Sequence, residues 1–285
     1  MARGKQPSIQ RNAGMKAAHG ELIYFLDDDS VPEPASLRRA TAHFADPQVK
    51  MAGGPNLCPP DAPALEQVFA LVLGSWLAFG PSRARYAPVG ALRQSSEKEL
   101  ILCNLAARRD VMLGLGGFNE ALYPNEENAL MDELLHRGGK LIYDPQLIVY
   151  RRPRRTLRAF ARMLRNYGRG RAEQFRVNPT RRSAVNFVPP FFLVFLVALP
   201  FLVFLTSVGK WWLLPLAIYG VLVLAQTAVL ARQGGLFRGL AAAPLIILTH
   251  ILYGYGFWRG LFTRLEPPGQ GAQEAVALEK IKSMG

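Results

Sequence analysis

The sequence predicts an α/β domain followed by three membrane-spanning helices. Residues 1–150 alternate helical and extended patterns, which is typical of a layered α/β arrangement. Three uncharged apolar runs follow at residues 187–206, 211–231 and 239–258. Each has about 20 residues, and at about 1.5 Å per residue a helix of that length spans the roughly 30 Å hydrocarbon core of a bilayer. An apolar content of 50% excludes a disordered chain.

The surplus positive charge is concentrated in one segment. Most of the net charge of +13 comes from residues 151–182, which contain 12 arginines and a single acid, Glu173. The chain therefore divides into a domain at 1–150, an Arg-rich segment at 151–185, the apolar runs within 186–262 and a tail at 263–285. With two cysteines, Cys58 and Cys103, a multi-bridge disulfide framework is excluded.

The arginines also predict how the apolar helices are oriented, because the cytoplasmic flanks of membrane helices carry the Lys/Arg excess. We expect the Arg-rich segment and the domain before it on the cytoplasmic face of the inner membrane. Three spans would leave the tail on the outside. The third run, which is rich in Gly and Ala and contains His250, has a second interpretation as a re-entrant hairpin. The tail carries no net charge and does not decide between the two.

The Arg-rich segment has a helical pattern of its own. Its apolar residues recur at helical spacing while arginines occupy the other faces: Leu157, Phe160, Ala161, Leu164 and Tyr167. This pattern predicts an amphipathic helix that lies on an anionic leaflet. A basic patch also suits nucleic acid, but the neighbouring membrane span favours lipid phosphates, and we expect no nucleic-acid partner.

Three adjacent aspartates follow the clearest strand of the domain. The strand is the apolar run at residues 22–26, which is typical of a buried strand in a parallel sheet, and it ends at Asp27, Asp28 and Asp29. Open α/β sheets bind ligands at the carboxyl ends of their strands, and Mg²⁺ or Mn²⁺ would relieve the repulsion between the carboxylates. The alternative is a solvated turn that caps the next helix.

The residues around these aspartates resemble part of a known family. Arg11-Asn12-Ala13-Gly14 precedes the strand, Ala18-His19-Gly20 leads into it, and Pro32 follows the aspartates. This order resembles the second half of the nucleotide-binding region of family 2 glycosyltransferases, which have the GT-A fold. The resemblance implies that Asp27 and Asp29 hold a divalent metal, Mn²⁺ or Mg²⁺, and that Arg11, Asn12, Asp27 and Asp28 bind a nucleotide-sugar donor.

A second stretch agrees in order and distance. The segment from Asn104 to Asp110 and then Gly116-Gly117-Phe118-Asn119-Glu120 resembles the acceptor-side loop of the family. Glu126 and Glu127 follow, where the family usually has Glu-Asp with the aspartate as the catalytic base. The resemblance therefore assigns Asn104 to the acceptor side and Glu127, with Glu126, to catalysis. The alternative is that both glutamates are acids in the first turn of a helix, and both interpretations can hold together.

Further downstream, Tyr167-Gly168-Arg169-Gly170-Arg171 resembles the element that closes over the donor diphosphate in membrane-attached members. This likeness assigns Arg169 and Arg171 to the donor, while arginines lying on lipid phosphates are the alternative. The stretch from Gly80 to Tyr86 is similar to the succinoglycan-type exopolysaccharide subgroup. The resemblance covers about residues 8–180, and its specificity comes from the order of the motifs.

One expected part of the family's domain does not precede these motifs. The family opens with a strand, a helix and a second strand before the Arg-Asn-x-Gly element, which here stands at Arg11. We therefore expect an N-terminally shortened, partial GT-A domain whose sheet lacks its central strand. A chain shortened in the cell could be inactive alone.

The sequence thus favours a membrane-anchored inverting glycosyltransferase. It would move a sugar from a nucleotide-sugar donor to a lipid-linked or polysaccharide acceptor in cell-envelope or exopolysaccharide synthesis. A second hypothesis is a truncated, non-catalytic remnant that serves as a membrane-bound subunit. A third, a small transporter or channel subunit, is disfavoured because the apolar runs contain no Asp, Glu, Lys or Arg. The donor sugar, linkage and oligomeric state do not follow from the sequence.

Overall fold

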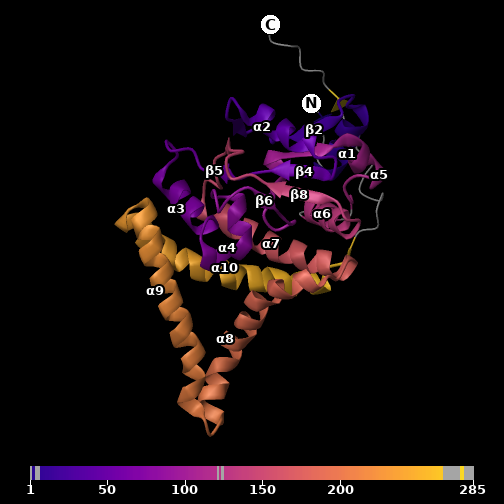
Figure 1. Cartoon of the computed structure of the whole chain (residues 1–285). Helices are drawn as coiled ribbons and strands as arrows, with labels where there is room; N and C mark the ends of the chain where they lie inside the picture. Colours follow the sequence, from indigo (N-terminus) through magenta and orange to yellow (C-terminus); the bar gives the residue numbers. More distant parts are fainter. Residues whose placement is uncertain (1, 4–6, 121, 123–124, 266–276, 279–285) are drawn as a thin grey trace. The chain divides into compact units, whose positions relative to one another are not determined.

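The computed structural model describes residues 2–3, 7–120, 122, 125–265 and 277–278 (Figure 1). The chain forms two compact units, each built from segments that are far apart in sequence. The first contains Met1–Asn56, Ala87–Tyr150 and Arg264–Gly285, and the second contains Leu57–Tyr86 and Arg151–Thr263. Residues 57–86 therefore group with the apolar helices rather than with the rest of the first 150 residues.

The first unit is made of short strands and helices. Its elements are β1 (Ala2–Arg3), α1 (Pro7–Ala17), β2 (Leu22–Phe25), β3 (Val31–Pro32), α2 (Ser36–Ala42), η1 (His43–Ala45), β4 (Val49–Gly53), β6 (Arg93–Gln94), η3 (Leu102–Asn104), β7 (Leu105–Arg108), α5 (Arg109–Gly114), α6 (Glu126–His136), β8 (Lys140–Tyr143), β9 (Val149–Tyr150) and β10 (Ala277–Leu278). The junction with the second unit falls within β5 (Asn56–Leu57).

A mixed five-stranded sheet is the centre of the first unit. Its order is β2-β7-β4-β8-β6; β7 is antiparallel to both β2 and β4, whereas β4 and β8 are parallel. Consequently β2, β4 and β8 point the same way, and the residues that follow them lie along one edge of the sheet. A smaller three-stranded sheet has the order β3-β9-β5.

The prediction of a buried parallel strand at residues 22–26 was wrong in two respects. Within the described residues, β2 pairs only with β7, and the pairing is antiparallel. All four residues of β2 are only half-buried. The apolar run forms a strand as predicted, but its burial depends on neighbours that local sequence does not specify.

Close packing joins β4 to the segment between β8 and β9. A methyl group on Gly54 would overlap the carbonyl oxygens of Asp144 and Leu147, so the backbones meet at a position that accepts no side chain. On one face of the sheet, a core cluster packs around these elements and consists of Ala40, Phe44, Val49, Ala52, Ala106 and Leu147. The core therefore fixes the carboxyl ends of β4 and β8 relative to each other.

The second unit is helical. Its elements are α3 (Ala64–Leu73), α4 (Trp76–Phe79), η2 (Gly80–Arg85), α7 (Leu157–Val177), η4 (Arg181–Phe187), α8 (Val188–Leu205), η5 (Gly209–Leu213), α9 (Leu214–Gly234) and α10 (Leu236–Phe262).

The predicted amphipathic helix is present as α7. Thr156 begins it, because its side-chain oxygen accepts a hydrogen bond from the amide of Ala159. Phe160 and Leu164 are fully buried, whereas Leu157 at the first turn is exposed. Phe160 stacks on Phe69 of α3 with ring centroids 4.3 Å apart, within a core cluster shared by α3, α7, α9 and α10. The apolar face therefore packs against protein.

Three helical segments are long and apolar enough to cross a membrane, and they coincide with the three predicted runs. They are Ser183–Leu205, Gly209–Gly234 and Leu236–Phe262. The bent pair Ala64–Leu73 and Trp76–Arg85, with 60° between its halves, is a fourth candidate as a broken span or re-entrant loop. The third run is one continuous helix through Pro244, and not the re-entrant hairpin that the sequence left open. Most of the tail, at 266–276 and 279–285, lies outside the described residues.

Candidate active site

Arg11 brings together the two acidic segments that the sequence singled out. Its side chain, on α1, donates a hydrogen bond of 2.5 Å from Nη1 to Oε1 of Glu126 at the start of α6. Its other terminal nitrogen, Nη2, lies 4.0 Å from Oδ1 of Asp27, just beyond the end of β2. Arg11 therefore carries a positive charge between carboxylates from segments about 100 residues apart.

Asn12 supports this site through the backbone of a neighbouring loop. Its amide nitrogen donates to the carbonyl oxygen of Phe118, and its amide oxygen accepts from the Phe118 amide at 2.8 Å. In a third hydrogen bond, the amide nitrogen of Asn12 donates to the carboxylate of Glu120. Gly117 has a φ of 79°, and a methyl group there would stand 2.5 Å from the Asn12 oxygen, so only glycine fits. Asn12 thus fixes the loop that leads to α6.

Glu126 is buried, with 2% of its surface exposed. Burial, and then the charge of Glu127, raise the pKa of Glu126 to about 7, against the opposing effects of Asn125 and Arg11. Its Oε2 accepts from the backbone amide of Asn125, while Oε1 accepts from Arg11. Both oxygens are therefore engaged within the protein, and the carboxyl group titrates close to neutral pH.

Glu127 lies beside it but is only half-buried. Asn128 donates to Glu127 Oε1 at 3.4 Å and to Asn125 Oδ1 at 2.5 Å, so the side-chain amide holds the start of α6. Asn125 has a φ of 142°, an unusual conformation for a residue with a side chain. Both glutamates occupy the first turn of α6, as the alternative interpretation predicted, and an acid is electrostatically favoured there.

The aspartates form a turn after β2 in which the Ser30 amide donates to the Asp27 carbonyl. Asp27 is half-buried, and Asp28 and Asp29 are exposed. Among the described residues, no three His, Cys, Asp or Glu side chains are grouped so that they could hold a metal ion. These aspartates fit a site in which one or two carboxylates share Mg²⁺ or Mn²⁺ with substrate phosphates. They do not fit a site in which protein side chains alone surround the metal.

Asn104 is fully buried. Its amide nitrogen donates to the carbonyls of Leu147 and Pro55 at 2.6 and 3.1 Å. Its oxygen accepts from the hydroxyl of Tyr24, whose pKa burial raises above its ordinary value. In this conformation Asn104 joins β2, β4 and the β8–β9 connection, and the acceptor role stays a prediction.

Arg169 and Arg171 belong to the second unit. On α7, Arg169 lies 3.5 Å from the carboxylate of Glu173, and Arg171 donates to the side chain of Gln174. Their expected role toward a donor diphosphate stays a prediction.

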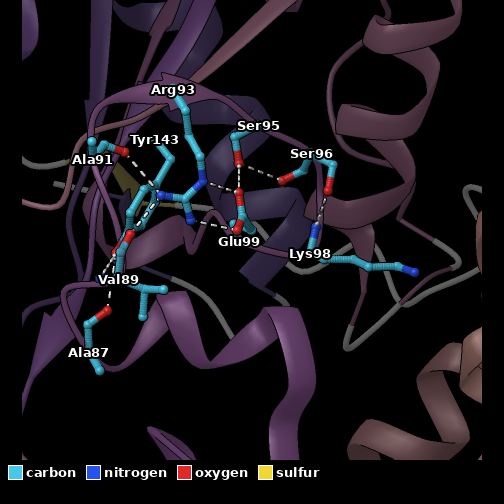
Figure 2. Close-up of polar contacts among 9 residues, drawn as sticks. All are labelled: Ala87, Val89, Ala91, Arg93, Ser95, Ser96, Lys98, Glu99 and Tyr143. Carbon is cyan, nitrogen blue, oxygen red and sulfur yellow. Dashed lines mark hydrogen bonds and ion pairs between the residues drawn. The ribbon is translucent and has the colours of Figure 1, made fainter. Parts of the chain in front are cut away.

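A polar network that the sequence did not indicate anchors the segment before β7 (Figure 2). Arg93 lies over the ring of Tyr143, with 4.4 Å between guanidinium carbon and centroid, and donates to both carboxylate oxygens of Glu99. It also donates to the carbonyls of Val89 and Ala91, while the Tyr143 hydroxyl donates to Ala87. No local pattern marks these residues, because the network depends on β6 pairing with β8.

This network supports one wall of a cavity of about 720 Å³. The lining residues come from α2, from the start of η1, from the segment next to Arg93 and from the turn after β8, and include Arg39, His43, Gly90, Leu92 and Asp144. Asp144 is buried and accepts from Arg39 at 3.3 Å and lies 2.9 Å from His43. None of the predicted site residues lines this cavity.

The described residues define an α/β protein with an acidic site at the carboxyl end of β2 and with helices suited to a membrane. A family model described as glycosyl transferase family group 2 matches residues 22–258, and the chain belongs to this family. The prediction of a family 2 glycosyltransferase with a GT-A-type α/β domain and three apolar C-terminal helices is therefore confirmed. The succinoglycan-type subgroup and the shortened N-terminus stay predictions.

The individual proteins that the chain resembles are distant relatives. Pre-mycofactocin glycosyltransferases from two strains of Mycobacterium tuberculosis are 28% identical over 166 residues, which cover 58% of this chain and 34% of theirs. The chain thus spans about a third of the length of these curated relatives. The mannosyltransferase PcManGT from Pyrobaculum calidifontis, solved in complex with GDP-Man and Mn²⁺, has a TM-score of 0.49 and 19% identity, covering 91% of this chain and 67% of that one.

Proposed function

We propose that the chain is a membrane-anchored inverting glycosyltransferase whose active site includes the acidic residues Asp27, Glu126 and Glu127. It would move a sugar from a nucleotide-sugar donor to a lipid-linked or polysaccharide acceptor in cell-envelope or exopolysaccharide synthesis. The contact of Arg11 with both Asp27 and Glu126 carries the proposal, because it brings the donor motif and the catalytic motif into one site. Membership of the family supplies the reaction class.

Glu127 is the candidate catalytic base. It would accept the proton of the acceptor hydroxyl as that oxygen attacks the anomeric carbon and the nucleoside diphosphate leaves. Glu126 suits this role less well, since both of its oxygens already accept hydrogen bonds from Arg11 and Asn125. Glu127 has a single weak hydrogen bond from Asn128 among those described and remains partly open to solvent.

Asp27 and Asp29 are the candidate residues for a divalent metal shared with the donor. Bound there, Mn²⁺ or Mg²⁺ would neutralise charge on the leaving diphosphate. Asp28, Arg169 and Arg171 would add donor contacts, and Asn104 would position the acceptor side through Tyr24. The Arg-rich helix α7 would hold the site close to a lipid-linked acceptor at the cytoplasmic face of the inner membrane.

Sugar transfer from tritiated UDP- and GDP-hexoses into membrane lipids and polysaccharide tests these roles. Glu127→Gln and Asp29→Ala should each reduce turnover at least 100-fold, the usual effect of losing a positioned base or charge stabilisation. Glu133→Gln is the matched control, because it lies on the same helix with an exposed carboxylate. EDTA should inhibit transfer, with rescue by Mn²⁺ or Mg²⁺. Unchanged turnover in both variants would eliminate the mechanism.

The second candidate is a non-catalytic subunit, which the placement of β2 favours. The apolar residues of β2 are half-exposed at the edge of the sheet. Within the described residues, the side of a nucleotide site that β2 would form is therefore incomplete. Calorimetry separates the two functions. The chain is titrated with UDP or GDP in the presence of Mn²⁺. If the chain binds a donor, binding should be saturable and Asp29→Ala should weaken it. If the chain is the subunit, no metal-dependent heat should appear.

A further inference from the structure

Helices α7 and α10 touch through their backbones along much of their length. Methyl groups on Gly168, Gly256 or Gly260 would overlap a carbonyl oxygen of the opposite helix, at Tyr253, Arg165 and Arg169 respectively. At the end of α7, Arg176 donates to the carbonyl of Gly260 at 3.2 Å. Nearer its start, Phe160 shares a core cluster with Ile246. The two helices therefore run in the same direction as a tightly joined pair.

The arginines of α7 limit how deep this pair can lie in a membrane. Arg158, Arg162, Arg165 and Arg176 are exposed along the helix, over more than four turns. Guanidinium groups are always charged, and in membrane helices they are found near the ends, in bundle interiors or against water. Helix α7 therefore belongs at the headgroup level, and because α10 is joined to it through backbone contacts, α10 must share that depth.

The opposite face of α10 fits the same placement. Its large exposed apolar residues form a stripe with helical spacing, which includes Phe237, Leu240, Ile247, Tyr255 and Phe262, while the exposed Arg259 lies in the last turn. Its other face is buried within the second unit by residues such as Ala242, Ile246 and Phe257. With 27 residues, α10 is about 40 Å long, which is more than the thickness of the hydrocarbon core. An amphipathic helix of this length can lie along the membrane interface.

The connections of α8 and α9 complete the argument. Both contact η5 at the turn between them, and both contact α10. Figure 1 shows α8 and α9 meeting at η5 and separating toward α10, which crosses their other ends with α7 beside it. A hairpin that enters the membrane and returns leaves both of these ends on one side.

We propose that α8 and α9 alone cross the membrane, while α7 and α10 lie together along an anionic lipid surface. The α7 arginines contact lipid phosphates, and the apolar stripe of α10 faces the acyl chains. Thr263, Arg264 and Leu265, which directly follow α10, are then on the same side as α7. Sequence hydropathy predicts a third span instead, because hydropathy depends only on the composition of α10. The contacts between α10 and α7 do not enter it.

Depth measurements with spin labels test this arrangement in phosphatidylcholine–phosphatidylglycerol vesicles. Labels are placed on the stripe by Leu240→Cys, Ile247→Cys and Tyr255→Cys, after Cys58→Ser and Cys103→Ala remove the native thiols. Oxygen and nickel-complex accessibility should report the same shallow depth at all three sites. A spanning helix would place the label at 247 at the bilayer centre and the other two about 10–12 Å shallower, which would overturn the proposal.

The same labels on α9 provide the control. Val221→Cys, Leu224→Cys and Val229→Cys occupy exposed positions on a helix that should cross, so their depths should change steadily by about 12 Å in total. Uniform shallow depths on α9 would refute the two-span hairpin.

The side of the membrane gives a second readout that does not disturb helix packing. In sealed vesicles, a membrane-impermeant maleimide should label Arg232→Cys and Arg264→Cys from one side and Val208→Cys from the other. Labelling of Arg264→Cys together with Val208→Cys would establish three spans and contradict the proposal.

Discussion

The guanidinium of Arg11 donates a 2.5 Å hydrogen bond to the buried carboxylate of Glu126, although the two residues are 115 positions apart. The same side chain approaches Asp27. Arg11 is thus a partner of both acidic motifs, and its charge opposes the rise in the Glu126 pKa that burial produces. This pairing makes the electrostatics of the site measurable without knowledge of the substrate.

Stability should depend on pH through Glu126. Its pKa is raised from the ordinary 4.5 to about 7, so the folded chain holds a proton that the unfolded chain releases between these values. The free energy of unfolding therefore falls as pH rises from about 4.5 to 7, by up to about 3 kcal/mol, and is level above. Glu126→Gln should remove this slope. Melting temperatures of both proteins between pH 4.5 and 8 measure it, and parallel curves would contradict the assignment.

A double-mutant cycle should reveal strong coupling between Arg11 and Glu126. Arg11→Met leaves a buried carboxyl without its cation, and we expect a loss of about 2–4 kcal/mol. Combined with Glu126→Gln the loss should be much smaller, which gives a coupling energy of at least about 1 kcal/mol in chemical denaturation. Additive effects would show that the ion pair does not form in solution. The exposed pair Arg137 and Glu133, treated in the same way, should couple by about 0.5 kcal/mol or less.

Asn104→Ala should be strongly destabilising. It removes the hydrogen bonds to Leu147, Pro55 and Tyr24 and leaves their buried polar groups unsatisfied. Each such group that water does not reach lowers the free energy of unfolding by about 1–3 kcal/mol. Gln48→Ala, at an exposed position of the same unit, should change stability by less than about 0.5 kcal/mol. Thermal unfolding compares the two, and equal melting temperatures would argue against the buried network.

The network around Arg93 should be sensitive to the shape of its cation. Arg93→Lys keeps the charge but loses the two-pronged contact with Glu99 and the guanidinium over the Tyr143 ring, so we expect a loss of about 1–2 kcal/mol in the free energy of unfolding. The control Arg137→Lys changes an exposed contact and should be nearly neutral. Limited proteolysis should cut residues 87–99 faster in the Arg93 variant. Equal cleavage rates would mean that Arg93 does not anchor this segment.

Gly256→Ala should separate α7 from α10. The added methyl group would overlap the carbonyl of Arg165, and such overpacking costs about 1–3 kcal/mol. Gly220→Ala on α9 has open space around the new methyl group and should be neutral or slightly stabilising. Melting temperatures in detergent compare the variants. A neutral Gly256→Ala would show that the helices are not in backbone contact.

Features carried by local patterns followed from the sequence. The strand at residues 22–25, the aspartates that end it, the amphipathic α7 and the three apolar helices all depend on residue spacing and composition within about 20 residues. Their existence was confirmed because periodicity directly sets which side chains share a face. The order of the motifs likewise indicated the family that the comparison shows.

Tertiary structure decided which of these parts meet. Arg11 pairs with Glu126, Asn104 closes a buried network, residues 57–86 join the helical unit and α10 lies against α7. Partners in these contacts are mostly more than 40 residues apart, and no local period links them. Hydropathy measures how readily a segment leaves water, whereas its position depends on the backbone it packs against. The sequence by itself therefore determined what each segment is, and only folding determined what each segment touches.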